Sequence, residues 1–346
     1  MKRIRTAVVG LGRIGWSRHI PQITGRADRF ELAAVVDMAP ERLLEAKEKY
    51  GVNGYTDIAE MIAAEHPELV VIASPTHLHR EHACRAMELG CDVFLEKPMA
   101  ATYEEAQQIV RCARKQGRKL MVYQPRRTDA APNQLKALVE SGKIGALRSY
   151  RRSYGAYARR ADWQSFRKFG GGMLNNYGAH YIDAAIYMTS GKVERVFCCK
   201  DIVASAGDAD DVVKVIFRME DGMTVDIDIN QAAGVAAPEW VLNGTCGGII
   251  SQVSPEGEEQ FRVRYFDPEA LPPITASDAL AAANRKYSND VPIPWKEEII
   301  PLDPSFEIDF YDKVYEYYGE DKPPFVPMEQ TLYVMELIDR CHRDAQ

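Results

Sequence analysis

The first third of the chain alternates short apolar runs with amphipathic stretches. Each apolar run is short enough for a buried strand, and the stretches between the runs have the charged and apolar spacing of helices. The predicted strands cover residues 4–9, 32–36, 69–72, 93–95 and 120–123. The clearest predicted helices cover residues 40–50, 79–89 and 103–116. This alternation predicts a parallel sheet with right-handed crossovers.

The pattern changes after Tyr123. Apolar and polar residues now alternate as in half-buried strands, and Asp221-Gly222 is typical of a hairpin turn. Strands are predicted at 193–203, 212–217 and 224–229, and helices at 132–141, 173–188, 307–318 and 328–342, with a loop-rich segment at 268–294. The sequence therefore predicts an α/β domain over 1–123 and an α+β domain with a largely antiparallel sheet over 124–346.

Length, charge and cysteine usage narrow the class of protein. A chain of 346 residues fits two domains, and its net charge of -7 argues against a general nucleic-acid binder. No uncharged apolar run reaches membrane-spanning length, and the apolar stretch after the basic start is too short for a signal peptide. Seven cysteines without a CxxC pair predict free thiols in a reducing cytoplasm.

A glycine fingerprint follows the first predicted strand and opens a helix. Its glycines are Gly10, Gly12 and Gly15, with Arg13 and Ile14 between the last two. In this context the first glycine permits a tight turn, the second lets a pyrophosphate approach the backbone, and the third lets helix and strand pack closely. The phosphates would meet free amides at the start of the helix. A purely structural turn is the alternative.

Asp37 ends the second predicted strand, about twenty residues after the glycines, where an acid binds the adenosine ribose. Its carboxylate would accept hydrogen bonds from the ribose hydroxyls and repel a 2′-phosphate, which favours NAD over NADP. Arg42 leaves room for NADP, and Asp37 could instead only cap the next helix.

A second turn at the same edge of the sheet follows the strand at 69–72. Its residues are Ser74, Pro75 and Thr76. They either line the cofactor cleft or form a plain strand-to-helix turn. His77, His79 and His82 follow, but neither a carboxylate nor a cysteine completes a ligand set, so we expect no metal site. Of these histidines, His79 is placed closer to the cofactor than His77.

The tripeptide Glu96-Lys97-Pro98 closes the strand at 93–95. Ligands of open α/β sheets bind at the carboxyl ends of strands, so a lysine here has a chemical explanation. Near a nicotinamide ring, its ammonium could bind a substrate hydroxyl and stabilise developing alkoxide charge. A surface ion pair is the alternative. A cis peptide at Pro98 would aim the lysine.

A polar cluster follows the glycines at 170–172. Asn176, His180 and Asp183 are spaced to lie on one face of a helix. A histidine in such surroundings can take the proton of a substrate hydroxyl while hydride leaves the carbon. A structural histidine is the alternative.

Together these motifs resemble the Gfo/Idh/MocA oxidoreductase family, named for glucose-fructose oxidoreductase and inositol dehydrogenase. The resemblance extends over essentially the whole chain and is carried by the glycine fingerprint, Asp37, the turn at 75–79, Glu96-Lys97-Pro98 and the cluster at 170–183. It implies a Rossmann domain, then a domain whose large open sheet makes homodimer or homotetramer contacts. It also implies hydride transfer between a nicotinamide cofactor and a sugar or cyclitol.

Carried over by position, the resemblance makes Lys97 and His180 the catalytic pair. Glu96 and Lys97 would also border the cofactor, and Trp163 would approach both cofactor and substrate. Asn176 stands where many members have aspartate; it can bind a sugar hydroxyl but supplies no charge to an imidazolium. Asp183 could then orient His180 instead. Gln164 replaces a frequent arginine.

The segment 148–168 holds seven basic residues against one acid, with three tyrosines interleaved. A basic rim would favour an acidic sugar or a sugar phosphate; a solvated strand face or a subunit contact is the plainer interpretation.

The function predicted from these motifs is NAD-dependent hydride transfer at a secondary hydroxyl or keto group of a sugar, inositol or derivative. The alternatives are an NAD-dependent glycoside hydrolase with transient oxidation and a non-catalytic dinucleotide-binding regulator. Predicted partners are a small carbohydrate or cyclitol and further copies of the chain, with no nucleic acid and no membrane.

Overall fold

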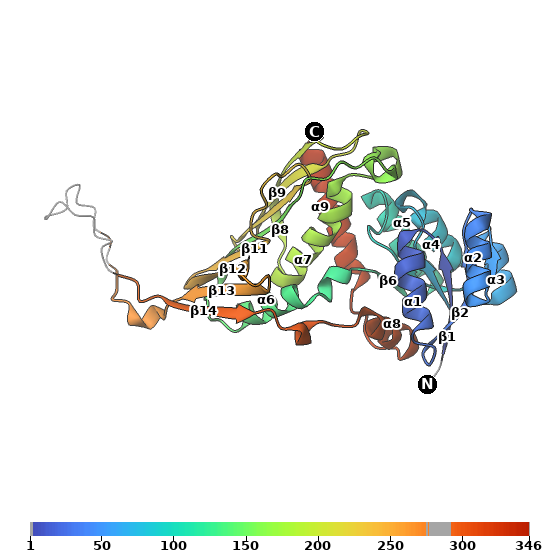
Figure 1. Cartoon of the computed structure of the whole chain (residues 1–346), viewed down its shortest axis with the longest axis horizontal. Helices are drawn as coiled ribbons and strands as arrows, with labels where there is room; N and C mark the ends of the chain where they lie inside the picture. The colour runs from blue at the N-terminus through green and yellow to red at the C-terminus, as the bar shows by residue number, and fades with distance from the viewer. Residues whose placement is uncertain (1–2, 275, 277–291, 346) are drawn as a thin grey trace.

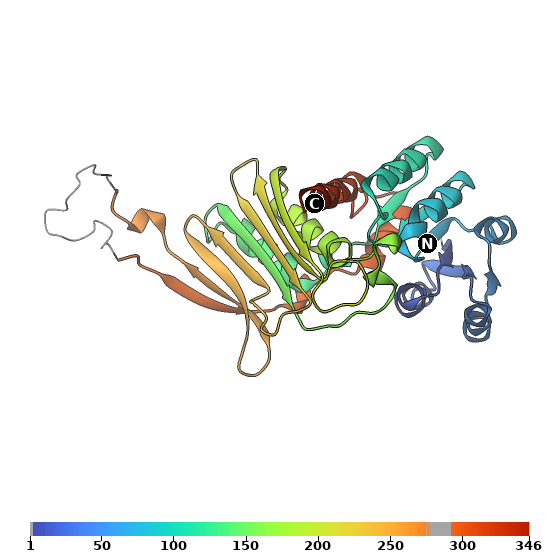
Figure 2. The ribbon, with the colours of Figure 1, turned by 90° about the horizontal axis from the view of Figure 1, so that it is seen from above.

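Two sheets organise the chain, one parallel and one mostly antiparallel (Figure 1). A computed structural model describes residues 3–274, 276 and 292–345. Seen from above, the sheets lie on either side of helices α7 (Ala179–Thr189) and α9 (Met328–Asp344) (Figure 2). The predicted fold class, a Rossmann domain followed by an α+β domain, is confirmed.

The first sheet has six parallel strands in the order β3-β2-β1-β4-β5-β6. Their bounds are Ile4–Val9 (β1), Phe30–Val36 (β2), Asn53–Tyr55 (β3), Leu69–Ile72 (β4), Asp92–Leu95 (β5) and Leu120–Val122 (β6). The strand order reverses between β1 and β4. A crevice at the carboxyl ends of strands beside such a reversal is where open α/β sheets bind ligands.

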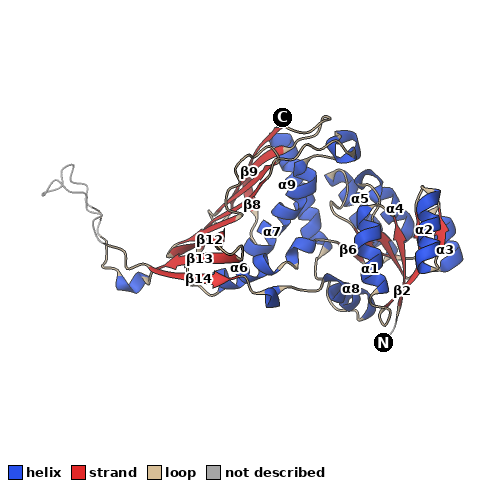
Figure 3. Cartoon of the chain, viewed as in Figure 1, coloured by secondary structure: helices blue, strands red, loops and turns tan. Residues whose placement is uncertain are grey.

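Helices cover both faces of this sheet, which explains why its strands are apolar on both sides (Figure 3). Side chains of α3, α4 and α5 pack on one face, and side chains of α1, α2 and α8 pack on the other. The bounds are Ile20–Thr24 (α1), Pro40–Tyr50 (α2), Ile58–Glu65 (α3), His79–Glu88 (α4), Tyr103–Gln116 (α5) and Phe310–Gly319 (α8). Local signals define the ends: Thr102 caps α5 through the Glu105 amide, and Gly117 ends it in a left-handed conformation.

The second sheet has eight strands in the order β14-β13-β12-β11-β7-β10-β9-β8. Among the described strands of this sheet, only the β7–β10 pair is parallel. The bounds are Leu147–Gly155 (β7), Val193–Asp201 (β8), Val212–Met219 (β9), Thr224–Asn230 (β10), Trp240–Gly244 (β11), Gly247–Val253 (β12), Glu259–Tyr265 (β13) and Lys296–Pro301 (β14). The alternation along β9 and β10 turns apolar side chains toward α7 and α9. Helix α6 (Ala130–Glu140) covers the same face, and no helix of the described residues lies on the opposite face (Figure 1).

The C-terminal part of the chain returns to the first domain. Phe310 and Tyr311 of α8 are buried against Phe30 and Phe94 of the parallel sheet. The sequence placed 124–346 in a single second domain, whereas α8 completes the core of the first. Its pattern predicted a helix but carried no information about which sheet the helix covers.

Several elements escaped the sequence analysis. The β3–α3 unit, β7 and strands β11–β14 were not predicted, because their strands are short or mix polar and apolar residues. Helix α7 is preceded by a π-helical turn at Leu174–Gly178 and does not form one regular helix from residue 173. In the loop-rich segment, residues 268–270 form a short turn, while 275 and 277–291 lie outside the described residues.

The structure also bears on the cysteines and on membrane insertion. All seven cysteines belong to the described residues and are free thiols. Among the helices of the described part, none has the length and apolar character needed to cross a bilayer.

Candidate active site

The glycine loop after β1 has three different steric environments. Gly10 has φ +95°, and a Cβ there would lie 2.7 Å from the backbone of Ala73. A Cβ on Gly15 would lie 1.9 Å from the Gly10 carbonyl oxygen. By contrast, a Cβ on Gly12 would meet no atom within 4 Å. Gly10 and Gly15 are therefore required by packing, while Gly12 leaves open space against which a pyrophosphate can lie.

Asp37 holds the glycine loop against the end of β2. Its Oδ2 accepts a hydrogen bond from the Leu11 amide at 2.7 Å, and its Oδ1 accepts one from the Ala39 amide at 2.9 Å. Arg42 lies 3.4 Å from Oδ2. Arg13 and Ile14 are exposed at the rim. The residues present thus fit a dinucleotide: an open cradle over Gly12 and a carboxylate at its ribose end.

The turn after β4 lies beside the glycine loop, because β1 and β4 are neighbouring parallel strands. Thr76 and Ser74 are buried, whereas Pro75 is exposed. His79 is 1% exposed, and its two ring nitrogens lie 2.9 Å from the carbonyl oxygens of Ser74 and Pro98. Burial lowers the pKa of His79. We therefore assign His79 a role in tying this turn to Pro98, and its predicted place beside the cofactor stays a prediction.

At the end of β5, Glu96 and Lys97 point in different directions. The Lys97–Pro98 peptide bond is cis. The Glu96 carboxylate turns into the core, where it lies 3.0 Å from His19 Nε2 and accepts a hydrogen bond from the Lys97 amide at 3.0 Å. The Lys97 side chain reaches across to the second domain, and its Nζ donates to Asn176 Oδ1 at 2.7 Å. Glu96 thus supports the turn from beneath.

Burial and neighbouring positive charges define the electrostatics of Lys97. Burial lowers the pKa of its ammonium to about 8. Glu96 opposes this shift, while Arg126, Arg160 and Arg13 add to it. Lys97 is therefore mainly protonated at neutral pH and loses its charge as the pH rises above about 8.

His180 lies in the first turn of α7, in the second domain. The π-helical turn before it is fixed by Asp210, whose Oδ2 accepts a hydrogen bond from the Leu174 amide at 2.8 Å. Burial lowers the pKa of His180 well below its usual value, with smaller contributions from Lys97, Arg126 and Arg152. The imidazole is therefore neutral at pH 7. Its Nδ1 is buried without a hydrogen-bond partner among the described residues.

Asp183 does not orient His180. Its two carboxylate oxygens accept hydrogen bonds from Nε and Nη2 of Arg127 at 2.8 and 2.6 Å, and both side chains are 1% exposed. The suggestion that Asp183 replaces the missing aspartate is therefore wrong. The helical spacing placed the two residues on one face, but Asp183 lies almost a full turn farther along and meets the interdomain linker.

Trp163 and Gln164 lie in a short turn (Trp163–Ser165) of the segment that leads to the glycines. The Gln164 side-chain oxygen is 3.5 Å from Asn176 Nδ2, and its backbone carbonyl accepts a hydrogen bond from Gly172 at 2.9 Å. Trp163 is 40% exposed. The structure thus brings Gln164 to the Lys97–Asn176 contact and leaves Trp163 at the solvent edge.

The basic segment does not form one rim. Arg151 lies on the uncovered face of the sheet, 3.6 Å from Asp226. Arg152 is buried, 2.9 Å from Glu239, with its guanidinium 4.0 Å from the ring centres of Tyr181 and Trp240. Alternation along β7 separates these neighbours. Of the seven basic residues, Arg160 is one whose charge acts on Lys97.

Some residues around the site escaped the sequence analysis. Arg126 acts electrostatically on both Lys97 and His180, and Gln124 is buried with its Oε1 unpartnered among the described residues. Both follow β6, at the carboxyl edge of the parallel sheet, so their position was the signal available. Asp210 and His19 act from distant segments and had no such signal.

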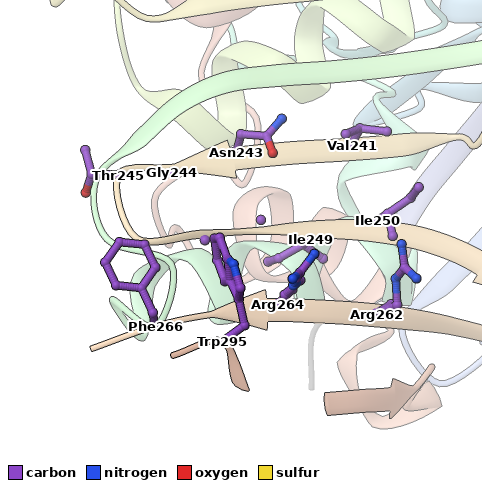
Figure 4. A pocket seen from close by; sticks show the side chains of 12 residues that line it. Val241, Asn243, Gly244, Thr245, Ile249, Ile250, Arg262, Arg264, Phe266 and Trp295 are labelled. Atoms are coloured by element: carbon purple, nitrogen blue, oxygen red, sulfur yellow. The ribbon is translucent and has the colours of Figure 1, made fainter. Parts of the chain in front are cut away.

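A separate pocket of about 420 Å³ lies on the uncovered face of the second sheet (Figure 4). Glycines 247 and 248 belong to its lining, with Phe266 and Trp295 at one end. It shares no lining residue with the cluster around Lys97, so it has no direct part in the chemistry of that cluster.

Two family models match most of the chain. Residues 4–124 match the oxidoreductase family with an NAD-binding Rossmann fold, and residues 133–250 match the GFO/IDH/MocA C-terminal domain. The chain belongs to the GFO/IDH/MocA oxidoreductase family. The predicted resemblance is confirmed. The N-terminal domain of the chain is an NAD-binding Rossmann fold.

Individual relatives are more distant. D-glucoside 3-dehydrogenase of Escherichia coli is 33% identical over 195 residues, or 54% of each chain. Inositol 2-dehydrogenase of Corynebacterium glutamicum is 28% identical over 234 residues, 66% of this chain and 67% of its own. The chain spans about half the length of the first curated relatives it matches, 52% to 56%. The WlbA dehydrogenase of Bordetella pertussis, solved with NADH and UDP-GlcNAcA, shares the fold with a TM-score of 0.78, 22% identity, and coverage of 99% and 97%.

Proposed function

We propose that this chain is an NAD-dependent oxidoreductase that moves hydride between nicotinamide and a secondary hydroxyl or keto carbon of a sugar, cyclitol or derivative. The observation that carries the proposal is the bond of 2.7 Å from Lys97 Nζ to Asn176 Oδ1, beside a neutral His180. Lys97 of the cofactor domain lies near enough to His180 of the other domain for its charge to act on the imidazole. Oxidation of an alcohol removes a hydride from carbon and a proton from oxygen, and a neutral imidazole can take that proton.

The two side chains have distinct roles. A bound nicotinamide supplies the hydride acceptor or donor. Lys97 donates a hydrogen bond to the substrate oxygen and stabilises negative charge there, which a protonated ammonium can do below pH of about 8. His180 takes the hydroxyl proton at a ring nitrogen during oxidation and returns it during reduction. Its lowered pKa keeps it neutral and ready to accept, and makes the resulting imidazolium a strong donor for the reverse step.

Asn176, which already binds Lys97, would also bind a substrate hydroxyl. Its side-chain oxygen receives the Lys97 ammonium, and its Nδ2 faces Gln164. An amide here leaves the site without the negative charge that aspartate would supply. The positive charges of Lys97, Arg126 and Arg160 are then less offset, so a substrate that carries a carboxylate would be favoured over a neutral one.

The cofactor proposal is NAD in preference to NADP. Asp37 has both oxygens fixed by backbone amides, which holds its negative charge at the ribose end of the cradle. A 2′-phosphate would meet this carboxylate directly. Arg42, 3.4 Å from Asp37, supports some use of NADP.

The test follows nicotinamide absorbance with NAD and NADP against polyols, aldoses, uronates and inositols. Turnover that prefers NAD and is lost on Lys97→Ala supports the proposal. Tight NADH binding without net redox points to glycoside cleavage with transient oxidation, which a chromogenic glycoside would reveal. Binding with neither reaction points to a dinucleotide-binding regulator.

Self-association through the uncovered sheet face is a further part of the proposal. Phe197 on β8 is 52% exposed and Ile299 on β14 is 48% exposed, and register places both on that face. A homodimer or homotetramer would cover them. Sedimentation of the wild type and of Phe197→Glu tests this: the proposal expects an oligomer that the variant weakens, and a monomeric wild type would contradict it.

A further inference from the structure

A row of three buried polar side chains lies beneath the Lys97 turn. The Tyr311 hydroxyl of α8 lies 2.7 Å from His19 Nδ1, and His19 Nε2 lies 3.0 Å from Glu96 Oε1. The other oxygen of Glu96 accepts the hydrogen bond from the Lys97 amide. His19, Tyr311 and Glu96 are 0%, 2% and 7% exposed. Polar groups this deep are costly to bury unless they are hydrogen-bonded, and here each one is bonded to the next. The proposed chemistry uses neither His19 nor Tyr311.

Hydrogen-bond donors and acceptors fix the direction of this row. An ionised carboxylate only accepts, so His19 Nε2 must carry a hydrogen to bond Glu96. In a neutral imidazole Nδ1 is then an acceptor, and Tyr311 donates to it. Each polar atom of the row therefore has one partner of the opposite kind. Removing the Tyr311 hydroxyl would leave His19 Nδ1 without the partner that it has in this row.

Aromatic rings hold the imidazole in place. The His19 ring packs edge-on against Phe94 at 5.7 Å and Tyr123 at 5.2 Å between ring centres. Tyr123 in turn accepts a hydrogen bond from Arg18 at 3.0 Å, which holds the Tyr123 ring against His19. The titratable groups whose charges act around Glu96 are His19, Tyr311, Tyr123 and His79, in addition to Lys97.

We infer that His19 and Tyr311 are positioning residues that hold the Glu96 carboxylate under the Lys97 turn and thereby keep Lys97 charged and aimed at the substrate oxygen. This inference rests on the proposed role of Lys97. The three side chains, called here the Tyr311–His19–Glu96 relay, come from three separate segments. Helix α8 follows the last strand of the second sheet along the chain but packs on the parallel sheet, so the relay links that returning helix to the reacting lysine.

The charges around Lys97 explain why the position of the Glu96 carboxylate matters for the charge of Lys97. Burial and three arginines lower the pKa of its ammonium, and Glu96 is the group that raises it. A carboxylate that moved away or took up a proton would leave the lysine with positive neighbours alone. Lys97 would then lose its proton at a lower pH, and its amide would lose the bond that sets the turn.

The test measures the titration of Lys97 directly, without substrate or cofactor. Competitive acetylation of the whole protein at a series of pH values, read peptide by peptide by mass spectrometry, gives the pKa of each lysine. Glu96→Gln keeps the size of the side chain and removes its charge, so the pKa of Lys97 should fall by about one unit. His19→Leu and Tyr311→Phe should lower it by smaller amounts in the same direction.

Tyr318→Phe is the matched control, because it too removes one tyrosine hydroxyl from α8. Tyr318 donates to the Val93 carbonyl, away from Glu96. This variant should change thermal stability but not the titration of Lys97. Tyr311→Phe is the variant expected to fold most readily, since it deletes one oxygen.

The possible outcomes separate the inference from the proposed function. An unchanged titration of Lys97 in folded Glu96→Gln and Tyr311→Phe proteins would overturn the relay. Equal shifts in Tyr311→Phe and Tyr318→Phe would also overturn it, since loosening of α8 alone would then be the cause. Full turnover by Lys97→Ala would instead remove Lys97 from the reaction, whatever the acetylation showed.

Discussion

The two sides of the proposed site, one for the cofactor and one for the substrate, are built in different ways. On the cofactor side, a loop of consecutive residues makes the cradle, and its shape is set mainly by the backbone. Gly10 and Gly15 are required by packing, and Asp37 is held by two backbone amides. On the substrate side, single side chains converge from elements far apart along the chain, with Lys97 after β5, Gln164 in a loop and His180 on α7.

This difference teaches where each side is vulnerable. Because the cradle is made of backbone, adding a side chain to one of its glycines should weaken dinucleotide binding. Substitutions of the other side chains around the cradle should have less effect on that binding. A cluster made of converging side chains changes when one of them is removed or recharged. Substitutions on the two sides should therefore separate binding of the dinucleotide from the chemical step.

The largest effect is expected on the substrate side. His180→Ala should lower turnover by roughly 10²–10⁴-fold, the usual contribution of a positioned acid–base group. Binding of NADH, followed by its fluorescence, should be unchanged, because His180 lies outside the cradle. A variant that retains full turnover would remove His180 from the reaction.

The reverse pattern is expected on the cofactor side. Gly12→Val places a side chain in space where a Cβ meets no atom within 4 Å, so the apo protein should be as stable as the wild type. NADH affinity should fall by about tenfold or more, about 1.4 kcal/mol. Gly10→Ala is the matched comparison: with φ +95° and a contact of 2.7 Å it should lower thermal stability as well. Undiminished NADH binding by Gly12→Val would show that the pyrophosphate lies elsewhere.

Asp37 tests the choice of dinucleotide on the same side. Asp37→Ser removes the carboxylate while keeping a hydroxyl, so the preference for NAD over NADP should fall by about tenfold or more, since a hydrogen bond to a charged group contributes about 1.5–3 kcal/mol. The ratio of kcat/KM for the two cofactors measures it. Arg42→Ala in this background should return part of the preference. An unchanged ratio would place the ribose away from Asp37.

The smallest effect is a shift in pH dependence on the substrate side. Asn176→Asp places a carboxylate where Lys97 Nζ now bonds at 2.7 Å, and this negative charge favours the ammonium. In the wild type the ammonium is present below pH of about 8 and lost above it, so the rate should fall there. In the variant that fall should move upward by about one pH unit or more. A profile of kcat/KM against pH measures it, and a downward shift would contradict the assignment.

The same contrast explains how much could be predicted from the sequence. The cradle was predictable because Gly10, Gly12, Gly15 and Asp37 act within one βαβ unit, where spacing along the chain determines position in space. The positions of Lys97 and His180 were predictable because a strand end and a helix face located them, while their catalytic roles stay predictions. The partner of Asp183 was not, since Arg127 lies on a linker 56 residues away, and a periodic pattern gives no contact between segments. The inward turn of Glu96 toward His19 was hidden for the same reason.

The most direct test of the central claim compares hydride transfer in the wild type and Lys97→Ala with the best substrate of the carbohydrate panel. Both proteins are first shown to bind NADH, and the formation of reduced nicotinamide is then followed by absorbance in a single turnover. We predict that the wild type transfers hydride and that the variant, with the dinucleotide bound, does not. Equal rates in the two proteins would contradict the claim that the edge where Lys97 meets Asn176 and His180 is the reaction site.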